Sequence, residues 1–337
     1  MDASIDKSED AAQQSPLARQ EVMAEVRSWG YQLQSLNVSS AAGAAVDLLV
    51  VDEEFEGRKP TERRSDILRT LKRKPDGRRR LVLAYLSIGE AEDYRRYWDR
   101  RWVAPAPPRP GTAHTGAVGT PAKSTSKPVL TAQPATPVVR PLMAPTSAAP
   151  AWLGDENDGW RGNFRVRFWD PSWQALMFGN ETAALERLVG AGFDGVYLDR
   201  ADVYQRWARD RPQARSDMED FIQRLAARAH ELSPGFVVVM QNAEELLGSN
   251  KIRGALDAVA KEDLLFGIDG DERPNKAADI EASLRLLKKA QRAGLPVLAV
   301  EYLSDEKKLA AARNQLTGNG FLPYFAPRAL DRLRTAD

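Results

Sequence analysis

The chain of 337 residues contains no cysteine and only two histidines, His114 and His230. The lack of cysteine excludes disulfide bonds, thiolate metal ligands and a cysteine nucleophile. Two histidines are too few for a histidine-rich metal cluster, and they argue against a Ser-His-Asp triad. Carboxylates are therefore the most available catalytic groups, and we expect no metal site.

The chain also lacks a charge excess and a long hydrophobic run. Its 48 Lys and Arg residues nearly balance 47 Asp and Glu residues, and the net charge of +1 gives no case for nucleic acid as the principal ligand. No apolar run approaches the roughly 20 residues of a membrane span. The polar first 20 residues show no signal peptide, and the sequence assigns no compartment. No G-x-G-x-x-G motif or P-loop follows the first predicted strand, so we expect no nucleotide or other cofactor.

One segment has no acidic residue at all. Residues 104–150 contain 11 of the 21 prolines, many alanines and threonines, and no Asp or Glu. Such a composition cannot bury enough apolar surface to offset the entropy lost on ordering. We therefore predict a disordered Pro/Ala-rich insertion over residues 104–150. Residues 1–25 are predicted to be a second flexible segment, which leaves residues 26–333 as one folded domain.

The remaining chain alternates short apolar runs with segments of helical periodicity, such as Met218–Leu232. Several runs are almost continuously apolar, as in strands that are buried on both faces of a parallel sheet. The predicted strands are Trp29–Gln34, Val46–Asp52, Leu81–Ser87, Val166–Asp170, Gly195–Asp199, Phe236–Gln241, Ala258–Glu262 and Pro296–Glu301. Eight strand–helix units predict an α/β fold, a (β/α)8 TIM barrel, with the insertion after strand three.

The predicted strands end in polar residues, and in a barrel of this type the chemistry lies at the carboxyl ends of the strands. These residues are Gln34, Asp52, Ser87 with Glu90 soon after, Asp170, Asp199, Gln241 with Asn242, Glu262 and Glu301. A carboxylate at such a position is often only a helix cap or a member of an ion pair, and Asp170 and Asp202 fit that interpretation. Asp199 and Glu262 fit it less well, because each lies in a strongly apolar run where an unused acid is costly.

Tryptophan is concentrated in the first two thirds of the chain. Trp152, Trp160 and Trp169 lie around the predicted fourth strand. Sugars stack on aromatic faces, so these residues are candidates for a subsite wall. The alternative, that they fill the core, is at least as consistent with the sequence.

Several segments together resemble glycoside hydrolase family 114, the endo-α-1,4-polygalactosaminidase-like proteins. The segments are WGYQLQ, VDLLVVD, LAYLSIGEAEDYRRYW, PAWLGDENDGWRGNFRVRFWDPSW, GFDGVYLDRADVY, VVVMQNAEELL, AVAKEDLLFG and GFLPYFAPRAL, which occur in this order over residues 29–330. The resemblance implies a (β/α)8 fold and hydrolysis of α-1,4-linked galactosamine polymers.

The resemblance also implies a catalytic pair, an aspartate that ends strand five and a glutamate that ends strand seven. These fall on Asp199 and Glu262. The implied substrate-binding residues are Asp52, Tyr85, Glu90, Tyr197, Asp202, Gln241, Asn242 and Glu301, to which the aromatic argument adds Trp169. The implied partner is a galactosamine-containing polysaccharide.

The sequence leaves open which of the two carboxylates is the acid, and whether the anomeric configuration is retained or inverted. Two alternatives stand beside the glycosidase. One is a catalytically silent carbohydrate-binding barrel of the cell envelope or a biofilm. The other is a metal-dependent hydrolase that uses the acidic strand ends.

Overall fold

The computed structural model describes residues 16–55, 63–106 and 141–334. Eight parallel strands form one sheet in the order β1-β2-β3-β9-β10-β11-β14-β15. Their bounds are β1 Trp29–Gln32, β2 Leu48–Val51, β3 Leu81–Ser87, β9 Gly195–Asp199, β10 Val237–Gln241, β11 Ala258–Glu262, β14 Val297–Glu301 and β15 Leu322–Phe325. The prediction of a (β/α)8 barrel is confirmed.

The sheet is nearly closed where its first and last strands meet. The Trp29 indole N–H donates to the carbonyl of Leu322 at 2.9 Å. The backbone N–H groups of Leu33 and Gln34 both donate to the carbonyl of Leu330, at 2.9 and 3.0 Å. The seam between β1 and β15 is thus held by a side chain and by the chain that follows β15.

One predicted strand is wrong, and one real strand was missed. The run Val166–Asp170 is not a barrel strand, because the chain turns after Val166 and Asp170 caps the next helix by accepting from the N–H of Ser172. The eighth barrel strand is β15, which the sequence analysis missed. It contains Pro323, and proline argues against a strand because it has no N–H group to donate to a neighbouring strand. Asp199 therefore ends strand four and Glu262 ends strand six, rather than strands five and seven.

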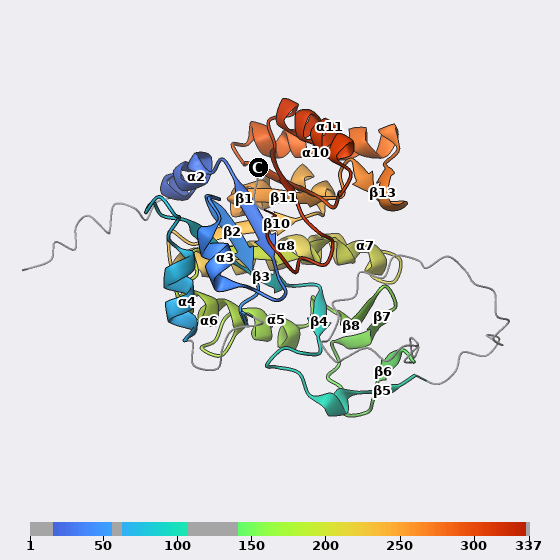
Figure 1. Cartoon of the computed structure of the whole chain (residues 1–337). Coiled ribbons are helices and arrows are strands. Elements are labelled where there is room, and N and C mark those ends of the chain that lie inside the picture. The colour runs from blue at the N-terminus through green and yellow to red at the C-terminus, as the bar shows by residue number, and fades with distance from the viewer. Residues whose placement is uncertain (1–15, 56–62, 107–140, 335–337) are drawn as a thin grey trace, which may run out of the picture.

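Helices surround the barrel and cover the outer face of its sheet (Figure 1). They are α3 Val38–Gly43, α4 Arg64–Leu71, α5 Pro171–Met177, α6 Ala184–Ala191, α7 Tyr204–Trp207, α8 Ala214–Leu232, α9 Asn250–Ala255, α10 Ala277–Arg292 and α11 Glu306–Gly318, with 3-10 turns η1 Arg100–Trp102, η2 Ala201–Val203 and η3 Glu244–Gly248. In the described ranges, no helix is both long enough and apolar enough to cross a membrane.

Alternation along the strands divides the core in two. Leu49, Val82 and Val196 belong to a cluster between sheet and helices. Their neighbours Val50, Leu83 and Tyr197 belong to a second cluster inside the barrel. Successive side chains of a strand point to opposite faces, so each strand serves both cores and its end carries a side chain to the rim.

Helix α2, Pro16–Glu25, lies where a flexible segment over residues 1–25 was expected. Its Met23 is fully buried in the inner cluster. Arg19 forms a buried ion pair with Asp257 at 3.0 Å and donates to the carbonyl of Pro234 at 2.6 Å. The ordered chain thus begins at least ten residues earlier than predicted.

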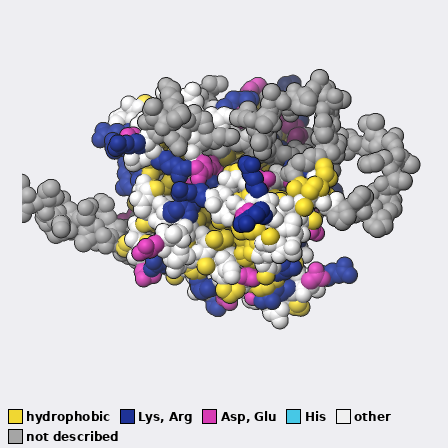
Figure 2. Space-filling model, turned by 90° about the horizontal axis from the view of Figure 1, so that it is seen from below, with side chains coloured by type: hydrophobic (Ala, Val, Ile, Leu, Met, Phe, Trp, Pro, Cys, Tyr) yellow, Lys and Arg dark blue, Asp and Glu magenta, His cyan; other side chains and the backbone are white. Residues whose placement is uncertain are grey.

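Between β3 and β9 the chain builds a small antiparallel layer beside the barrel. Strands β4 Glu90–Glu92, β8 Trp160–Val166 and β7 Leu153–Asn157 form one sheet, and β5 Val103–Pro105 pairs with β6 Met143–Pro145. The insertion predicted over 104–150 therefore has ordered ends, while residues 107–140 lie outside the described residues. Seen from this side, hydrophobic side chains lie in the middle of the face among Lys and Arg side chains (Figure 2).

The hairpin β12 Phe266–Gly267 and β13 Gly270–Pro274 follows β11. Its fold depends on Glu301, which accepts the N–H groups of Leu265 and Phe266 at 2.8 and 3.2 Å. This hairpin brings Asp271 to the mouth of the barrel.

Candidate active site

A cleft of about 260 Å³ opens at the carboxyl ends of the barrel strands. Asp199 and Glu262 both line it, although 63 residues separate them in the sequence. Other lining residues come from the ends of several strands and from the loops after them: Tyr31, Gln34, Tyr85, Glu90, Glu92, Trp160, Asn163, Arg200, Gln241, Asp271, Tyr302 and Arg328. The parallel sheet brings Asp199 and Glu262 together, because all its carboxyl ends meet at one rim, and the antiparallel layer adds Glu90, Glu92, Trp160 and Asn163.

A larger hollow of about 460 Å³ lies elsewhere, beside α5 and α6. Its lining is also largely polar, with Glu53, Arg96 and Arg187 among the charged residues, and it shares Glu92 with the cleft. Asp199 and Glu262 are not among the described residues that line it. We take the smaller cleft as the candidate active site, because it gathers polar groups at the strand ends of the barrel.

Asp199 is the last residue of β9. Its Oδ2 accepts the Tyr85 hydroxyl at 2.7 Å, and its Oδ1 accepts the backbone N–H of Arg200 at 2.7 Å. Burial raises the pKa of Asp199 to about 7, with the charge of Arg200 opposing and that of Glu262 adding to the rise. This carboxyl group is therefore partly protonated near neutral pH.

Glu262 is the last residue of β11 and is surrounded by donors. Its Oε2 accepts the side-chain amides of Gln241 and, at 3.0 Å, Asn242. Its Oε1 accepts the Tyr302 hydroxyl at 2.8 Å. Burial and the charge of Asp263 raise the pKa of Glu262, while the bonds from Tyr302 and Asn242 oppose the rise. The donors fix the orientation of this carboxylate.

Asp199 and Glu262 influence each other's ionisation, and together they supply one protonated and one ionised carboxyl group. Each raises the cost of ionising the other, so the pair retains a proton to a higher pH than isolated carboxyl groups would. A carboxylic acid beside a carboxylate in one cleft is the set of groups that glycoside hydrolysis requires.

The backbone is strained directly after three adjacent strands. Arg200, Asn242 and Asp263, which follow β9, β10 and β11, have φ angles of 62°, 57° and 52°. A non-glycine residue rarely adopts this left-handed conformation, and such residues cluster at functional sites. The last side chain of each strand therefore lies at the rim of the barrel, and the residue after it also lies at the mouth.

The wall of the cleft is built on Glu90, which is buried at the start of β4. Its Oε1 accepts Arg200 and Asn157, both at 2.8 Å, and its Oε2 accepts Asn163 at 3.4 Å. These bonds join β9 to the antiparallel layer. Glu90 thus supports the wall and lines the cleft, and its role in substrate binding stays a prediction.

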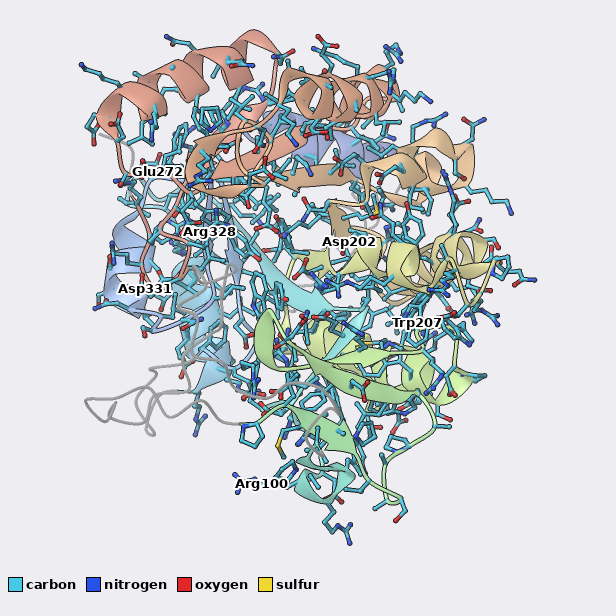
Figure 3. The ribbon with its side chains drawn as sticks, turned by 90° about the vertical axis from the view of Figure 1, so that its right-hand side faces the viewer. Arg100, Asp202, Trp207, Glu272, Arg328 and Asp331 are labelled. Atoms are coloured by element: carbon cyan, nitrogen blue, oxygen red, sulfur yellow. The ribbon has the colours of Figure 1, made fainter. Side chains whose placement is uncertain are left out.

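A second hollow of about 340 Å³ adjoins the cleft across Glu262. It shares Trp160, Arg200, Glu262 and Arg328 with the cleft. Asp202 and Asn242 line it as well, and Figure 3 shows Asp202 and Arg328 on two sides of this region. The two hollows therefore form neighbouring parts of one mouth, with Glu262 between them.

The structure brings five of the nine predicted substrate-binding residues to these hollows: Tyr85, Glu90, Asp202, Gln241 and Asn242. The remaining four lie elsewhere. Asp52 is buried in a two-bond ion pair with Arg95, at 3.1 and 2.8 Å. Tyr197 is fully buried beneath the acids. Neither residue is among the described residues that line the cleft or the adjoining hollow.

Trp169 and Glu301 also lie away from the cleft. The Trp169 ring packs edge-on against Trp207, 5.0 Å between centroids, and Figure 3 shows Trp207 further out than Asp202. Glu301 is fully buried under the hairpin β12–β13, and burial raises its pKa to about 8. Of the three candidate tryptophans, Trp160 faces the cleft, while Trp152 is buried against Trp102 and Trp173.

Sequence reasoning missed Tyr302, Arg200 and Arg328. Tyr302 directly follows Glu301, so placing the rim one residue later on β14 would have found it. Arg200 follows Asp199 in the same way. Arg328 lies after a strand that the sequence analysis did not recognise, and no local signal marks it.

Among the described residues, no three histidine, cysteine, aspartate or glutamate side chains are grouped so that they could hold a metal ion. The cleft and the adjoining hollow together have nine carboxyl groups and three cationic side chains, namely Glu90, Glu92, Asp199, Asp202, Glu244, Glu245, Glu262, Asp263 and Asp271 against Arg200, Lys261 and Arg328. The mouth is therefore strongly acidic.

Comparison with known proteins identifies a family and several relatives. A family model described as glycoside-hydrolase family GH114 matches residues 142–336, which include both acids. An uncharacterized protein of Deinococcus radiodurans is 30% identical over 95% of this chain and 86% of its own length. An uncharacterized protein of Methanocaldococcus jannaschii is 29% identical over 91% of this chain and 78% of its own length.

Solved structures share the fold. The glycoside hydrolase domain of PelA from Pseudomonas aeruginosa matches with a TM-score of 0.57 and 18% identity, covering 92% of this chain and 98% of that chain. At this level of identity the likeness shows a common barrel.

Proposed function

The chain belongs to glycoside hydrolase family GH114, and from this premise we propose that it cleaves α-1,4-linked galactosamine polymers with Asp199 and Glu262 as the catalytic pair. The resemblance that the sequence carries to this family is confirmed by the family match and by the barrel. The chain is a glycosidase, and the linkage, the sugar and the roles of the residues are the proposal.

The observation that carries the proposal is the meeting of Asp199 and Glu262 in one cleft, both with raised pKa values. One of them protonates the leaving glycosidic oxygen, and the other attacks the anomeric carbon or activates water. Retention of the anomeric configuration in the product would identify the second carboxylate as a nucleophile, and inversion would identify it as a base.

The acidic mouth supports an amino sugar as the substrate. Deacetylated galactosamine carries a positive charge, and a cleft with nine carboxyl groups against three cations attracts a cationic polymer. Each cation offsets one carboxylate by pairing, Arg200 with Glu90, Arg328 with Asp263 and Lys261 with Glu244, and the remaining carboxyl groups leave the mouth with an acidic excess.

The proposal is tested by incubating the protein with a panel of polymers and identifying the products by mass spectrometry. The panel contains deacetylated and N-acetylated α-1,4-galactosamine polymers, chitosan as a β-linked cationic control, and polygalacturonate as an α-linked anionic control. We expect oligosaccharides from the deacetylated α-linked polymer, with a KM that rises with salt because screening weakens the attraction. Binding of a polymer without any product would favour a carbohydrate-binding barrel, and loss of turnover with a chelator would favour metal-dependent hydrolysis.

Trp160 offers a separate test of how the substrate lies. It is half-buried, begins β8 and lines both hollows, so a sugar face can stack on its indole ring. We expect Trp160→Ala to raise KM about tenfold with a smaller change in kcat, since stacking of this kind contributes about 1 kcal/mol or somewhat more. Trp169→Ala is the matched control and should leave KM unchanged. Equal effects of the two substitutions on KM would contradict this placement.

A further inference from the structure

Arg328 lies in the loop after β15 and contacts three elements at the mouth of the barrel. Its guanidinium group donates two hydrogen bonds to the Asp263 carboxylate, both at 2.9 Å. Its Cζ lies 4.4 Å from the centroid of the Tyr302 ring. Its Nε lies 2.7 Å from Oδ1 of Asp271 on β13. Arginine is suited to this place because one planar group can bind a carboxylate with two bonds and stack on a ring.

The first two contact residues, Asp263 and Tyr302, are both direct neighbours of Glu262. Asp263 is the next residue in the chain and has the left-handed φ of 52° that turns it away from the strand. Tyr302 donates its hydroxyl to Oε1 of Glu262 at 2.8 Å. Arg328 therefore holds the backbone on one side of Glu262 and a hydrogen-bond donor on the other.

We propose that Arg328 is a positioning residue, which fixes Glu262 through Tyr302 and offsets the negative charge that Asp263 places beside it. The proposal rests on the proposed function in that Glu262 is one of the reacting carboxylates. Arg328 acts on Glu262 through its neighbours, since both of its terminal nitrogens donate to Asp263 and its planar face lies over the Tyr302 ring.

The effect of the Asp263 charge on Glu262 can be measured as a change in the pKa of Glu262. After burial, that charge is the largest cause that raises the pKa of Glu262. The charge of Arg328 opposes it from the other side of Asp263, so removal of Arg328 should raise the pKa of Glu262 further. The other charged or titratable groups around Glu262 come from every neighbouring element: Tyr31, Tyr197, Asp199, Arg200, Asp202, Glu244, Lys261, Asp271 and Tyr302. None of these changes in the variants below.

The loop around the ion pair is tightly packed. Gly267 has a φ of 110°, and a Cβ atom there would collide with the Asp263 carboxylate and lie 3.1 Å from a guanidinium nitrogen of Arg328. The ion pair between Arg328 and Asp263 fits here because the hairpin β12–β13 has a glycine, which lacks a side chain, at position 267.

The test measures the titration of Glu262 by NMR in full-length protein labelled with carboxyl-¹³C glutamate, with Glu262→Gln used to assign the signal. We expect Arg328→Gln to raise the apparent pKa of Glu262 by about 0.5–1 pH unit, from the loss of one charge at short range in a partly buried site. Arg328→Lys keeps the charge but loses the two-bond geometry, so it should shift the pKa less. On a substrate that is cleaved, kcat of Arg328→Gln should fall about tenfold, and its pH optimum should move to higher pH.

The decisive comparison is the double variant Arg328→Gln/Asp263→Asn. Removing the charge of Asp263 should return the pKa of Glu262 most of the way to its original value, because the unbalanced charge is gone. Arg332→Gln is the control, since Arg332 lies exposed in the same loop and pairs with Asp331 at 3.3 Å. It should leave the titration unchanged.

An unchanged titration in Arg328→Gln, or an equal shift in the single and double variants, would overturn the proposal and leave Arg328 with a structural role. The titration needs no turnover. If the protein cleaves no amino-sugar polymer, the proposed function fails while the role of Arg328 is still decided.

Discussion

Asp199→Asn and Glu262→Gln should each lower kcat on the cleaved polymer by about 10³-fold or more, while binding of the polymer persists. Each substitution keeps the size of the side chain but removes either the proton donor or the second carboxylate, and a single acid or base contributes about 10²–10⁴-fold. The loss should appear in kcat, because the missing interaction is made in the transition state. Initial rates from reducing-end release, together with binding of the polymer to the inactive variants, measure both quantities.

Two exposed acids provide controls for this experiment. Asp210 and Glu281 lie on the surface away from the cleft, and Asp210→Asn and Glu281→Gln should retain the full rate. Activity within a few fold of the original in either Asp199→Asn or Glu262→Gln would reject the assigned pair. Added azide separates the roles through its product, because rescue of a variant that lacks the nucleophile gives a glycosyl azide of inverted anomeric configuration, whereas rescue of a variant that lacks the acid/base group of a retaining enzyme gives a retained one.

Asp199→Asn should also make the protein more stable, and more so as the pH rises. In the folded protein burial raises the pKa of Asp199 to about 7, against 3.8 for an unperturbed aspartate, so the folded state binds more protons between these values. The unfavourable contribution of Asp199 is therefore absent below about pH 4, grows as the pH rises, and is complete above about pH 7. We expect the gain in the free energy of unfolding to be larger by about 2–3 kcal/mol at pH 8 than at pH 5.

Urea unfolding of the original protein and of Asp199→Asn at the two pH values measures this difference. Asp210→Asn again serves as the control, since an exposed carboxyl group should show a pH-independent effect. A gain that is equal at both pH values, or larger at pH 5, would show that Asp199 ionises as readily in the folded protein as in the unfolded one. An enzyme that loses activity and gains stability through the same substitution would show the cost of keeping a buried acid.

The sequence predicts most of the barrel, because strands buried on both faces produce continuous apolar runs. Seven of the eight barrel strands coincide with predicted strands, although only some of them are almost continuously apolar. Val166–Asp170 was predicted because its apolar residues resemble a strand, but Val166 ends β8 and the chain then turns, with Val166 and Phe168 buried. β15 was missed because it contains Pro323, which is tolerated there because β15 lies at the seam of the sheet.

The site is predicted only in part, for a different reason. The position of a residue at a strand end predicts that its side chain lies at the rim of the barrel, and this was sufficient to place Asp199 and Glu262 there. It does not tell whether the side chain turns to the cleft or to a partner. Asp52 meets Arg95, and Glu301 meets the backbone of the hairpin β12–β13. Such partners come from remote parts of the chain, so they become visible only in the folded structure.

The pairing of β5 with β6 has a consequence for engineering the connection between them. The two strands place Pro105 opposite Met143, one strand spacing of about 5 Å apart. When the ends of a flexible connection are fixed in this way, each doubling of its length costs only about 0.6 kcal/mol of closure entropy. A connection of another length can therefore be introduced between β5 and β6, and the antiparallel layer and the barrel are expected to keep their register.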